Sequence, residues 1–123
     1  MKRSDLSTMS DDHLVERFAE IALAQDRALL NDEISKFNEL YREKRAVEDE
    51  LKTRPGDQRR LLLRLYEHEN AQVRLNAAKS TLAVAPTTAR EALERLAASK
   101  EFPQAGDAGM SIVNLDRGIF KPV

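Results

Sequence analysis

The histidine and carboxylate side chains near the start of the chain have a spacing that could hold a metal ion. His13, Glu16 and Glu20 follow one another at about one helical turn, and a histidine beside carboxylates forms half of many metal sites. The only other histidine, His68, lies between two glutamates in a distant segment, and the chain has no cysteine. Two histidines leave a coordination shell incomplete. We therefore interpret the first cluster as a solvated helix face and expect no metal or other cofactor.

Catalytic patterns of other kinds are missing from the sequence. No serine lies in a G-x-S-x-G turn, and "RPGDQRR" (residues 54–60) lacks the glycines and the Lys-Ser/Thr pair that hold phosphates. The sequence therefore predicts a protein that is not an enzyme. A small metal-dependent enzyme that uses His13 and Glu16 is the weakest alternative.

The composition favours a folded helical protein in a reducing compartment. The chain has 123 residues, of which 41% are hydrophobic and 33% charged, and its formal net charge is −1. The near-neutral charge and the absence of tryptophan disfavour nucleic acid as a partner. No apolar run approaches the length of about 20 residues that a membrane span requires. We expect a cytoplasmic protein with no cysteine chemistry and no membrane contact.

The first 56 residues predict a long helical hairpin. Ser10 and the acids after it form a helix start, "NDE" at Asn31 offers a break, and Pro55 with Gly56 ends a second helix at about residues 32–53. Apolar residues recur at helical spacing along both segments: Leu14, Phe18, Ile21, Ala22 and Leu29, then Ile34, Phe37, Leu40, Tyr41, Val47 and Leu51.

Residues 57–99 predict three shorter helices. Asp57 can cap the first, "QRRLLLRLYEHE". Asn70 caps a second helix that continues to Ala85 and ends at Pro86, and Thr88 with Glu91 forms a capping box for the third. In residues 100–123 we expect a short helix capped by Asp107 and closed by Gly118. The tail "IFKPV" is expected to lie extended against the core.

The helix after Asn70 is apolar on two flanks, which is typical of a helix sandwiched between neighbours. The flanks are Val73, Ala77, Thr81 and Val84 on one side and Leu75, Ala78, Leu82 and Ala85 on the other, leaving Gln72, Asn76, Lys79 and Ser80 for a narrow wet edge. Arg74 projects between the flanks, so we expect a buried guanidinium that requires carboxylate or carbonyl acceptors.

Two further polar residues fall on apolar stripes of the hairpin. Gln25 lies near the middle of the first stripe, and we expect a structural amide that bonds main-chain groups. Lys44 lies within the second stripe, and we expect its stem to cover apolar surface while its ammonium stays in water.

The stretch "QRRLLLRLYEHENAQVRLNAAKSTLAVAP" resembles a HEAT or armadillo repeat. The likeness lies in an outer amphipathic helix, a polar turn at Glu69-Asn70, and an inner helix with Val73-Arg74, Ala77-Ala78 and Leu82. The repeat usually has Asp and Pro in that turn, where this chain has Asn70 and Ala71, so the acidic partner must come from elsewhere. The layout, with "ALAQDRALL", "VRLNAAKSTL" and "LDRGIFKP", also resembles a small bacterial family of unknown function with HEAT-like helices.

These observations predict an all-α fold of five to six helices in one domain. The resemblance implies a right-handed HEAT/ARM-like α-α stack: an N-terminal helical hairpin (1–56), HEAT-like helices (57–99), and a short helix with a tail (100–123).

We expect the protein to be a non-enzymatic protein-interaction module, for example an adaptor or a toxin-neutralising protein by analogy. The expected partner surface combines three residues of the long helix with two arginines that follow it: Glu39, Arg42, Glu43, Arg60 and Arg64. A homodimer through the stripe from Phe37 to Leu51 is a specific variant. Binding of a nucleic-acid backbone by Arg60 and Arg64 is the second class of function considered.

Overall fold

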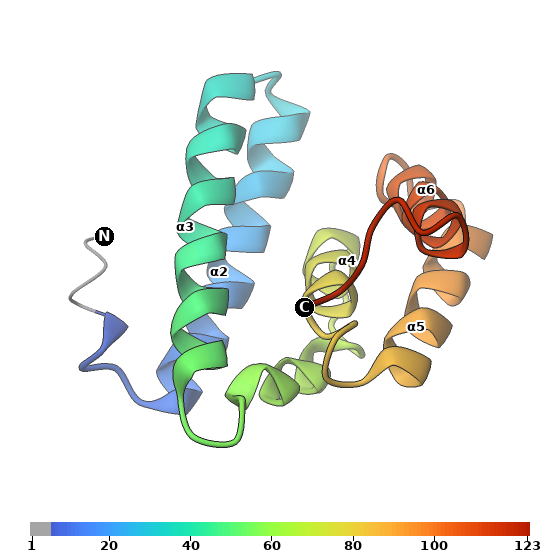
Figure 1. Cartoon of the computed structure of the whole chain (residues 1–123). Helices are drawn as coiled ribbons and strands as arrows, with labels where there is room; N and C mark the ends of the chain where they lie inside the picture. The colour runs from blue at the N-terminus through green and yellow to red at the C-terminus, as the bar shows by residue number, and fades with distance from the viewer. Residues whose placement is uncertain (1–5) are drawn as a thin grey trace. The chain divides into compact units, whose positions relative to one another are not determined.

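Helices form all the regular secondary structure in the computed structural model, which describes residues 6–123 (Figure 1). In chain order they are α2 (Asp11–Leu30), α3 (Ile34–Thr53), the 3₁₀-helix η1 (Gln58–Leu65), α4 (Ala71–Ser80), α5 (Pro86–Ala98) and α6 (Gln104–Asp116). The chain divides into two compact units, one ending at Leu61 and the other spanning Leu62–Val123. The predicted all-α class with an N-terminal helical hairpin is confirmed.

The ends of the hairpin helices are set by local backbone chemistry. Ser10 caps α2, because its hydroxyl accepts a hydrogen bond from the backbone N–H of His13 at 3.1 Å. At the other end Asp32 has a left-handed backbone with φ 59°. This conformation lets the N–H of Asp32 reach the carbonyl of Leu29 at 3.3 Å and the N–H of Glu33 reach that of Ala28 at 2.8 Å. The helix end is therefore a Schellman motif, and the predicted break near Asn31 is confirmed.

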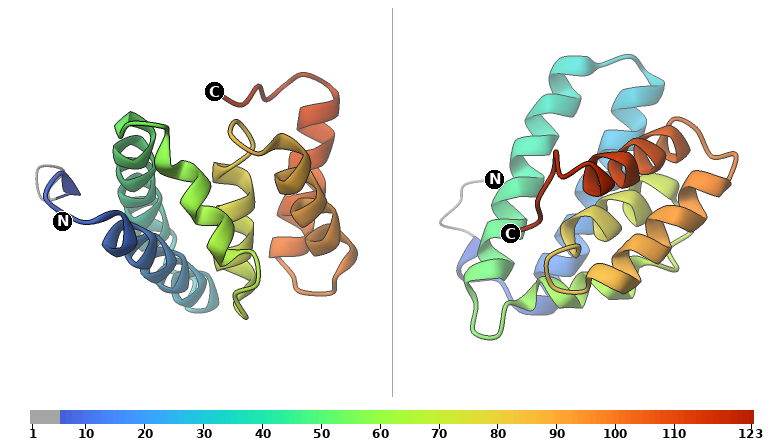
Figure 2. Two further views of the ribbon diagram at one scale, coloured as in Figure 1. Left: turned by 90° about the horizontal axis from the view of Figure 1, so that it is seen from below. Right: turned by 45° about the vertical axis from the view of Figure 1, so that its right-hand side comes forward.

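The helices α2 and α3 pack side by side and antiparallel, as Figures 1 and 2 show. Most of the predicted stripe residues are buried: Leu14, Phe18, Ile21, Ala22, Leu40, Val47 and Leu51. The stripe from Phe37 to Leu51 is therefore largely covered within the chain, which leaves little of it for a contact between two copies. Leu29, Ile34 and Tyr41 are exposed instead.

Buried polar side chains interrupt the apolar stripes of the hairpin. Gln25 is buried, as predicted. Lys44 is also buried, and its ammonium lies 3.3 Å from the carboxylate of Glu48 and 4.7 Å from the centre of the Tyr41 ring. The expectation that this ammonium stays in water is wrong, because a carboxylate and an aromatic face together replace its hydration.

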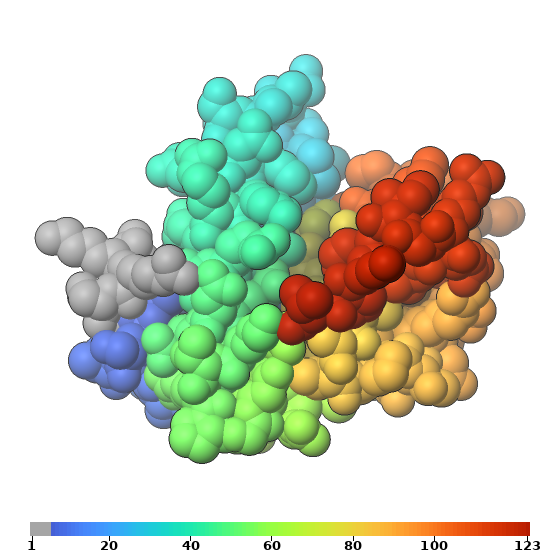
Figure 3. Space-filling view, viewed as in Figure 1, coloured from blue at the N-terminus to red at the C-terminus, as the bar shows by residue number. Residues whose placement is uncertain are grey.

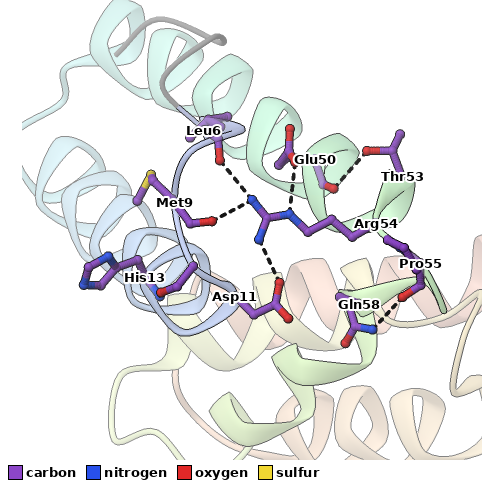
Figure 4. A network of polar contacts seen from close by, with 10 residues as sticks. Leu6, Met9, Asp11, His13, Glu50, Thr53, Arg54, Pro55 and Gln58 are labelled. Atoms are coloured by element: carbon purple, nitrogen blue, oxygen red, sulfur yellow. Dashed lines mark hydrogen bonds and ion pairs between the residues drawn. The ribbon is translucent and has the colours of Figure 1, made fainter.

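Arg54, at the end of α3, joins that helix to the segment that precedes α2 (Figure 4). Its guanidinium donates to the backbone carbonyls of Leu6 at 3.0 Å and Met9 at 2.7 Å. It also pairs with the carboxylates of Asp11 at 2.8 Å and Glu50 at 3.0 Å. One planar cation thus satisfies four acceptors and closes the end of the hairpin opposite to Asp32.

Asp57 caps the start of η1, as the sequence predicts, but the helix that follows is of a different type from the one expected. The backbone N–H of Arg59 donates to the Asp57 carboxylate at 3.3 Å, and the Arg59 guanidinium binds both carboxylate oxygens at 2.9 and 2.7 Å. This guanidinium lowers the pKa of Asp57. The pairing therefore stabilises the folded protein at pH values above the ordinary pKa of aspartate. The stabilisation is lost as the pH falls through the lowered pKa. The segment is a 3₁₀-helix and not the expected α-helix. Apolar residues three apart, such as Leu62 and Leu65, fit three residues per turn as well as 3.6.

In the second unit, the predicted caps are partly right. The Asn70 side chain accepts from the N–H groups of Gln72 at 2.8 Å and Val73 at 3.2 Å, which confirms it as the cap of α4. However, α4 ends at Ser80, because the residues up to Ala85 form a turn closed by the bond from the N–H of Ala85 to the carbonyl of Thr81, at 2.8 Å.

The starts of α5 and α6 were predicted too late. Pro86 occupies the first turn of α5, where its fixed φ and missing N–H are favourable. The capping box of Thr88 and Glu91 is therefore wrong. The helix α6 begins at Gln104, and the Asp107 carboxylate binds the Lys79 ammonium at 2.9 Å and the Ser111 hydroxyl at 3.2 Å where a cap was expected.

The end of α6 is closed by glycine, as predicted. Gly118 has φ 69°. The N–H of Gly118 donates to the backbone carbonyl of Leu115 at 3.2 Å, and the N–H of Ile119 donates to that of Asn114 at 2.9 Å. The two bonds form another Schellman motif. The expectation for the tail is wrong: Ile119, Phe120 and Val123 are exposed. The left-handed turn at Gly118 redirects the chain at this point.

The core of the second unit lies between α4, α5 and α6 and is built from small and medium apolar side chains: Leu75, Ala78, Leu82, Ala89, Leu93, Leu96 and Ala108. The predicted apolar flank that contains Leu75, Ala78 and Leu82 is thereby confirmed as part of the core. The predicted wet edge is right only for Lys79, which is exposed, and wrong for Gln72, Asn76 and Ser80, which are buried. The Gln104 amide donates to Gln72 at 3.0 Å, and Gln72 donates in turn to Asn76 at 2.9 Å. A chain of amides that starts on α6 thus provides hydrogen-bond partners for two of the buried polar side chains of α4, Gln72 and Asn76.

Replacing Gln104 with alanine is expected to lower the free energy of unfolding by about 1–3 kcal/mol, because the buried amide oxygen of Gln72 loses its donor. The measurement is chemical denaturation of the wild type, Gln104→Ala, Gln72→Ala and the double variant. The two substitutions should be coupled by about 0.5–1.5 kcal/mol. Lys100→Ala, at an exposed position of the same unit, is the control. Additive effects would contradict the amide chain.

Candidate functional site

The structure places the expected partner residues of α3 in different environments. Glu39 and Arg42 are exposed on this helix, and Figure 3 shows the surface of α3 in green and teal. Glu43 is half-buried, and its carboxylate accepts a hydrogen bond from the Arg17 guanidinium of α2. Glu43 therefore cross-links the hairpin, whereas Glu39 and Arg42 present their charges to solvent.

The arginines of η1 do not share one face in the way an α-helix would arrange them. Arg60 and Arg64 are both exposed. In a helix of three residues per turn, positions four apart point about a third of a turn away from each other. Arg60 also donates to the backbone carbonyl of Asp57 at 3.4 Å. The 3₁₀ winding thus divides the basic patch expected at this segment.

The histidine and carboxylate candidates do not assemble into a metal site. His13, Glu16 and Glu20 lie on α2, where His13 is exposed. Within residues 6–123, no three His, Asp or Glu side chains lie close enough together to hold a metal ion. His68 belongs to the second unit and contributes to a pocket there.

Arg74 binds an acid from outside its own turn. One guanidinium nitrogen lies 2.8 Å from both carboxylate oxygens of Glu101, in the segment between α5 and α6, and 3.4 Å from the backbone carbonyl of Glu69. The prediction that Arg74 requires carboxylate and carbonyl acceptors is confirmed. The expected full burial is wrong, since 25% of the side chain is exposed. Arg74 lines a pocket at this place.

This pocket, named here the His68 pocket, has a volume of about 290 Å³. Its polar lining comes from the corner between η1 and α4 together with α5: Tyr66, Glu67, His68, Glu69, Arg74 and Arg95. Ala92 and Leu96 of α5 supply an apolar wall. The pocket therefore combines charges of both signs with a surface for methylene groups.

Hydrogen bonds show which atoms of His68 and Tyr66 in the His68 pocket carry a hydrogen. The Nδ1 atom of His68 accepts from the N–H of Asn70 at 3.0 Å, so neutral His68 carries its proton on Nε2. The Thr81 hydroxyl donates to the Ala77 carbonyl at 2.8 Å, so the Tyr66 hydroxyl donates to Thr81. Burial raises the pKa of Tyr66, which keeps the phenol neutral. Neither group is arranged as a nucleophile beside a base.

A second pocket, named here the tip pocket, lies at the turn between α2 and α3. It has a volume of about 160 Å³ and is lined by Ala28, Leu29, Asp32, Glu33, Ile34 and Phe37. Ile34 is 68% exposed, and Leu30, next to the lining residues, is 79% exposed. Leu29 and Ile34 belong to the apolar stripes predicted from the sequence, but both are exposed. Their position next to the loop between the two helices could have indicated this exposure, because a residue at a helix end has no further helical turn beside it to cover its side chain.

No helix within the described part of the chain has the length and apolar character needed to cross a membrane. The comparison with curated proteins gave no match.

A crystal structure, that of the protein RPA1889 from Rhodopseudomonas palustris CGA009, is similar to this chain with a TM-score of 0.93 and 55% sequence identity. The similarity covers 96% of this chain and 98% of that one. The model of a family described as a domain of unknown function, DUF2019, matches residues 12–116. Because this match extends from the first helix of the hairpin to the last residue of α6, the chain belongs to the DUF2019 family.

Proposed function

We propose that this protein is a non-enzymatic protein-interaction module that binds a partner protein at the tip pocket. The observation that carries the proposal is the exposure of Leu30 and Ile34 beside an apolar depression. Contiguous exposed apolar surface of this kind marks interaction sites in soluble proteins. An adaptor and a toxin-neutralising protein would both use such a surface.

The size and charge of the tip pocket specify the chemistry of the partner. An apolar cavity of about 150 Å³ holds a benzene-sized group, so a volume of about 160 Å³ suits one Phe or Leu side chain. The charged residues that line it, Asp32 and Glu33, are both acidic and exposed. The proposed occupant is therefore an amphipathic helix of the partner with one bulky apolar anchor and basic residues beside it.

Backbone hydrogen bonds hold the turn that forms the tip pocket. The backbone hydrogen bonds of Asp32 and Glu33 to the end of α2 fix its path. A pre-organised surface loses little conformational entropy on binding, which favours a small docking site of this kind.

The test is an NMR titration of the ¹⁵N-labelled protein with a synthetic amphipathic helix that carries one Phe between lysines. Chemical-shift changes are expected at residues 28–37. The Leu30→Glu, Ile34→Glu double variant should bind at least about tenfold more weakly, because each change places a charge in the apolar contact.

The matched control is the Met110→Glu, Val113→Glu double variant, which changes two exposed apolar residues of α6. It should bind like the wild type. Equal affinity of both double variants would overturn the proposal, as would equal binding of a peptide in which glutamates replace the lysines.

A further inference from the structure

The His68 pocket carries both positive and negative groups around one small volume. Arg95 of α5 is exposed and lines this pocket together with Tyr66. His68 lines the same pocket, and because its Nδ1 accepts from the N–H of Asn70, its ring N–H lies on Nε2 and offers a further donor. Glu67 and Glu69 line the same pocket and are exposed.

These charges disfavour a simple ion as the ligand. The charge of Arg74 is offset by Glu101, which accepts two hydrogen bonds of 2.8 Å from it. Arg95 then remains as the cation of a pocket that is also lined by two carboxylates, those of Glu67 and Glu69. A lone anion would be repelled by Glu67 and Glu69, and a lone cation would be repelled by Arg95.

We infer that the His68 pocket binds a small zwitterionic group, one that carries a carboxylate and an ammonium on the same molecule. The carboxylate binds Arg95 and the Nε2–H of His68, and the ammonium binds Glu67 and Glu69. The inference concerns the second unit only. It does not depend on the function proposed for the tip pocket.

The volume and the apolar wall limit the size of this ligand. Liquid water occupies about 30 Å³ per molecule, so a pocket of about 290 Å³ holds a ligand of roughly ten non-hydrogen atoms. Ala92 and Leu96 offer apolar surface to the methylenes between the two charges. A ligand such as 6-aminohexanoate has this size and this distribution of charge.

The experiment compares three probes by NMR titration: 6-aminohexanoate, hexanoate and hexylamine. The zwitterion should bind with a Kd on the order of 1 mM, as expected for so small a ligand, and should shift the amides of residues 66–74 and Arg95. Hexanoate and hexylamine should each bind at least about tenfold more weakly, since each lacks one of the two charges.

Variants separate the inferred site from non-specific binding. Arg95→Gln, and the Glu67→Gln, Glu69→Gln double variant, should each weaken 6-aminohexanoate binding at least about tenfold. Arg117→Gln, another exposed arginine of this unit, should leave it unchanged. The Leu30→Glu, Ile34→Glu variant should also leave it unchanged, which distinguishes a failure here from a failure at the tip pocket.

The same pair of charges occurs at the end of a peptide whose last residue is lysine. Tighter binding of such a tripeptide than of 6-aminohexanoate would support a polypeptide terminus as the source of the group, and weaker binding a free small molecule. The inference is overturned if 6-aminohexanoate shows no binding even at concentrations well above the millimolar range. It is also overturned if hexanoate binds equally well, or if Arg95→Gln has no effect.

Discussion

Replacing Phe18 with alanine is expected to lower the free energy of unfolding by about 3–5 kcal/mol. Phe18 is completely buried and is the largest fully buried side chain within residues 6–123. Its truncation removes a whole ring from water-free packing and leaves a cavity that the helices cannot close. Small domains have a total stability of about 5–15 kcal/mol, so a large part of the stability would be lost. Thermal and urea denaturation followed by circular dichroism measure the change.

Two variants test whether the effect of Phe18→Ala comes from packing. Phe18→Leu retains most of the buried volume and should cost about 1–1.5 kcal/mol. Leu30→Ala removes a side chain of similar hydrophobicity from the exposed tip and should change the stability by no more than about 0.5 kcal/mol. If Leu30→Ala proved as costly as Phe18→Ala, the tip would be part of the core and not a free surface.

Replacing Arg54 with alanine is expected to lower the free energy of unfolding by about 2–3 kcal/mol. The guanidinium serves four acceptors in Figure 4, two of them the backbone carbonyls of Leu6 and Met9. Its loss removes the Arg54 donor from the Met9 carbonyl, leaves the Leu6 carbonyl with the N–H of Met9 alone, and leaves Asp11 and Glu50 without their cation. Chemical denaturation measures the loss. Hydrogen exchange should also become faster at the start of α2, because the segment before it is no longer held.

Arg54→Lys and Arg42→Ala are the controls for this prediction. A lysine has one compact donor group and cannot reach four acceptors in one plane, so Arg54→Lys should lose at least half as much stability as Arg54→Ala. Arg42 is an exposed arginine on the same helix, and Arg42→Ala should have an effect within about 0.5 kcal/mol. Full stability of Arg54→Lys would show that only the positive charge matters.

Those helix ends whose hydrogen bonds are local could be predicted from the sequence. Ser10, Asn70 and Gly118 each act through backbone groups within five residues of themselves, so residue type and spacing contain the necessary information. The start of α5 was missed because a competing local signal, Pro86, begins this helix ahead of Thr88. The start of α6 was missed because the Asp107 carboxylate binds Lys79, which is 28 residues away in the sequence.

The partners in long-range polar contacts could not be predicted from the sequence. The need of Arg74 for an acid followed from its place among apolar residues, but nothing in the sequence singled out Glu101 from the other glutamates. Gln72 and Asn76 appeared as a solvated edge of α4 because their partner, Gln104, lies on another helix. Both pockets were missed for the same reason. Each is formed by residues on two or more elements, whose packing the periodicity of one helix does not contain.

The contact between Arg54 and the segment ahead of α2 has an evolutionary consequence. Two of its acceptors are main-chain oxygens, which every amino acid supplies. Mutations at residues 7–9 can therefore accumulate without breaking this contact, provided that the path of the backbone is kept. Position 54 has no such freedom, because among the twenty amino acids only arginine offers a planar fork of five donors.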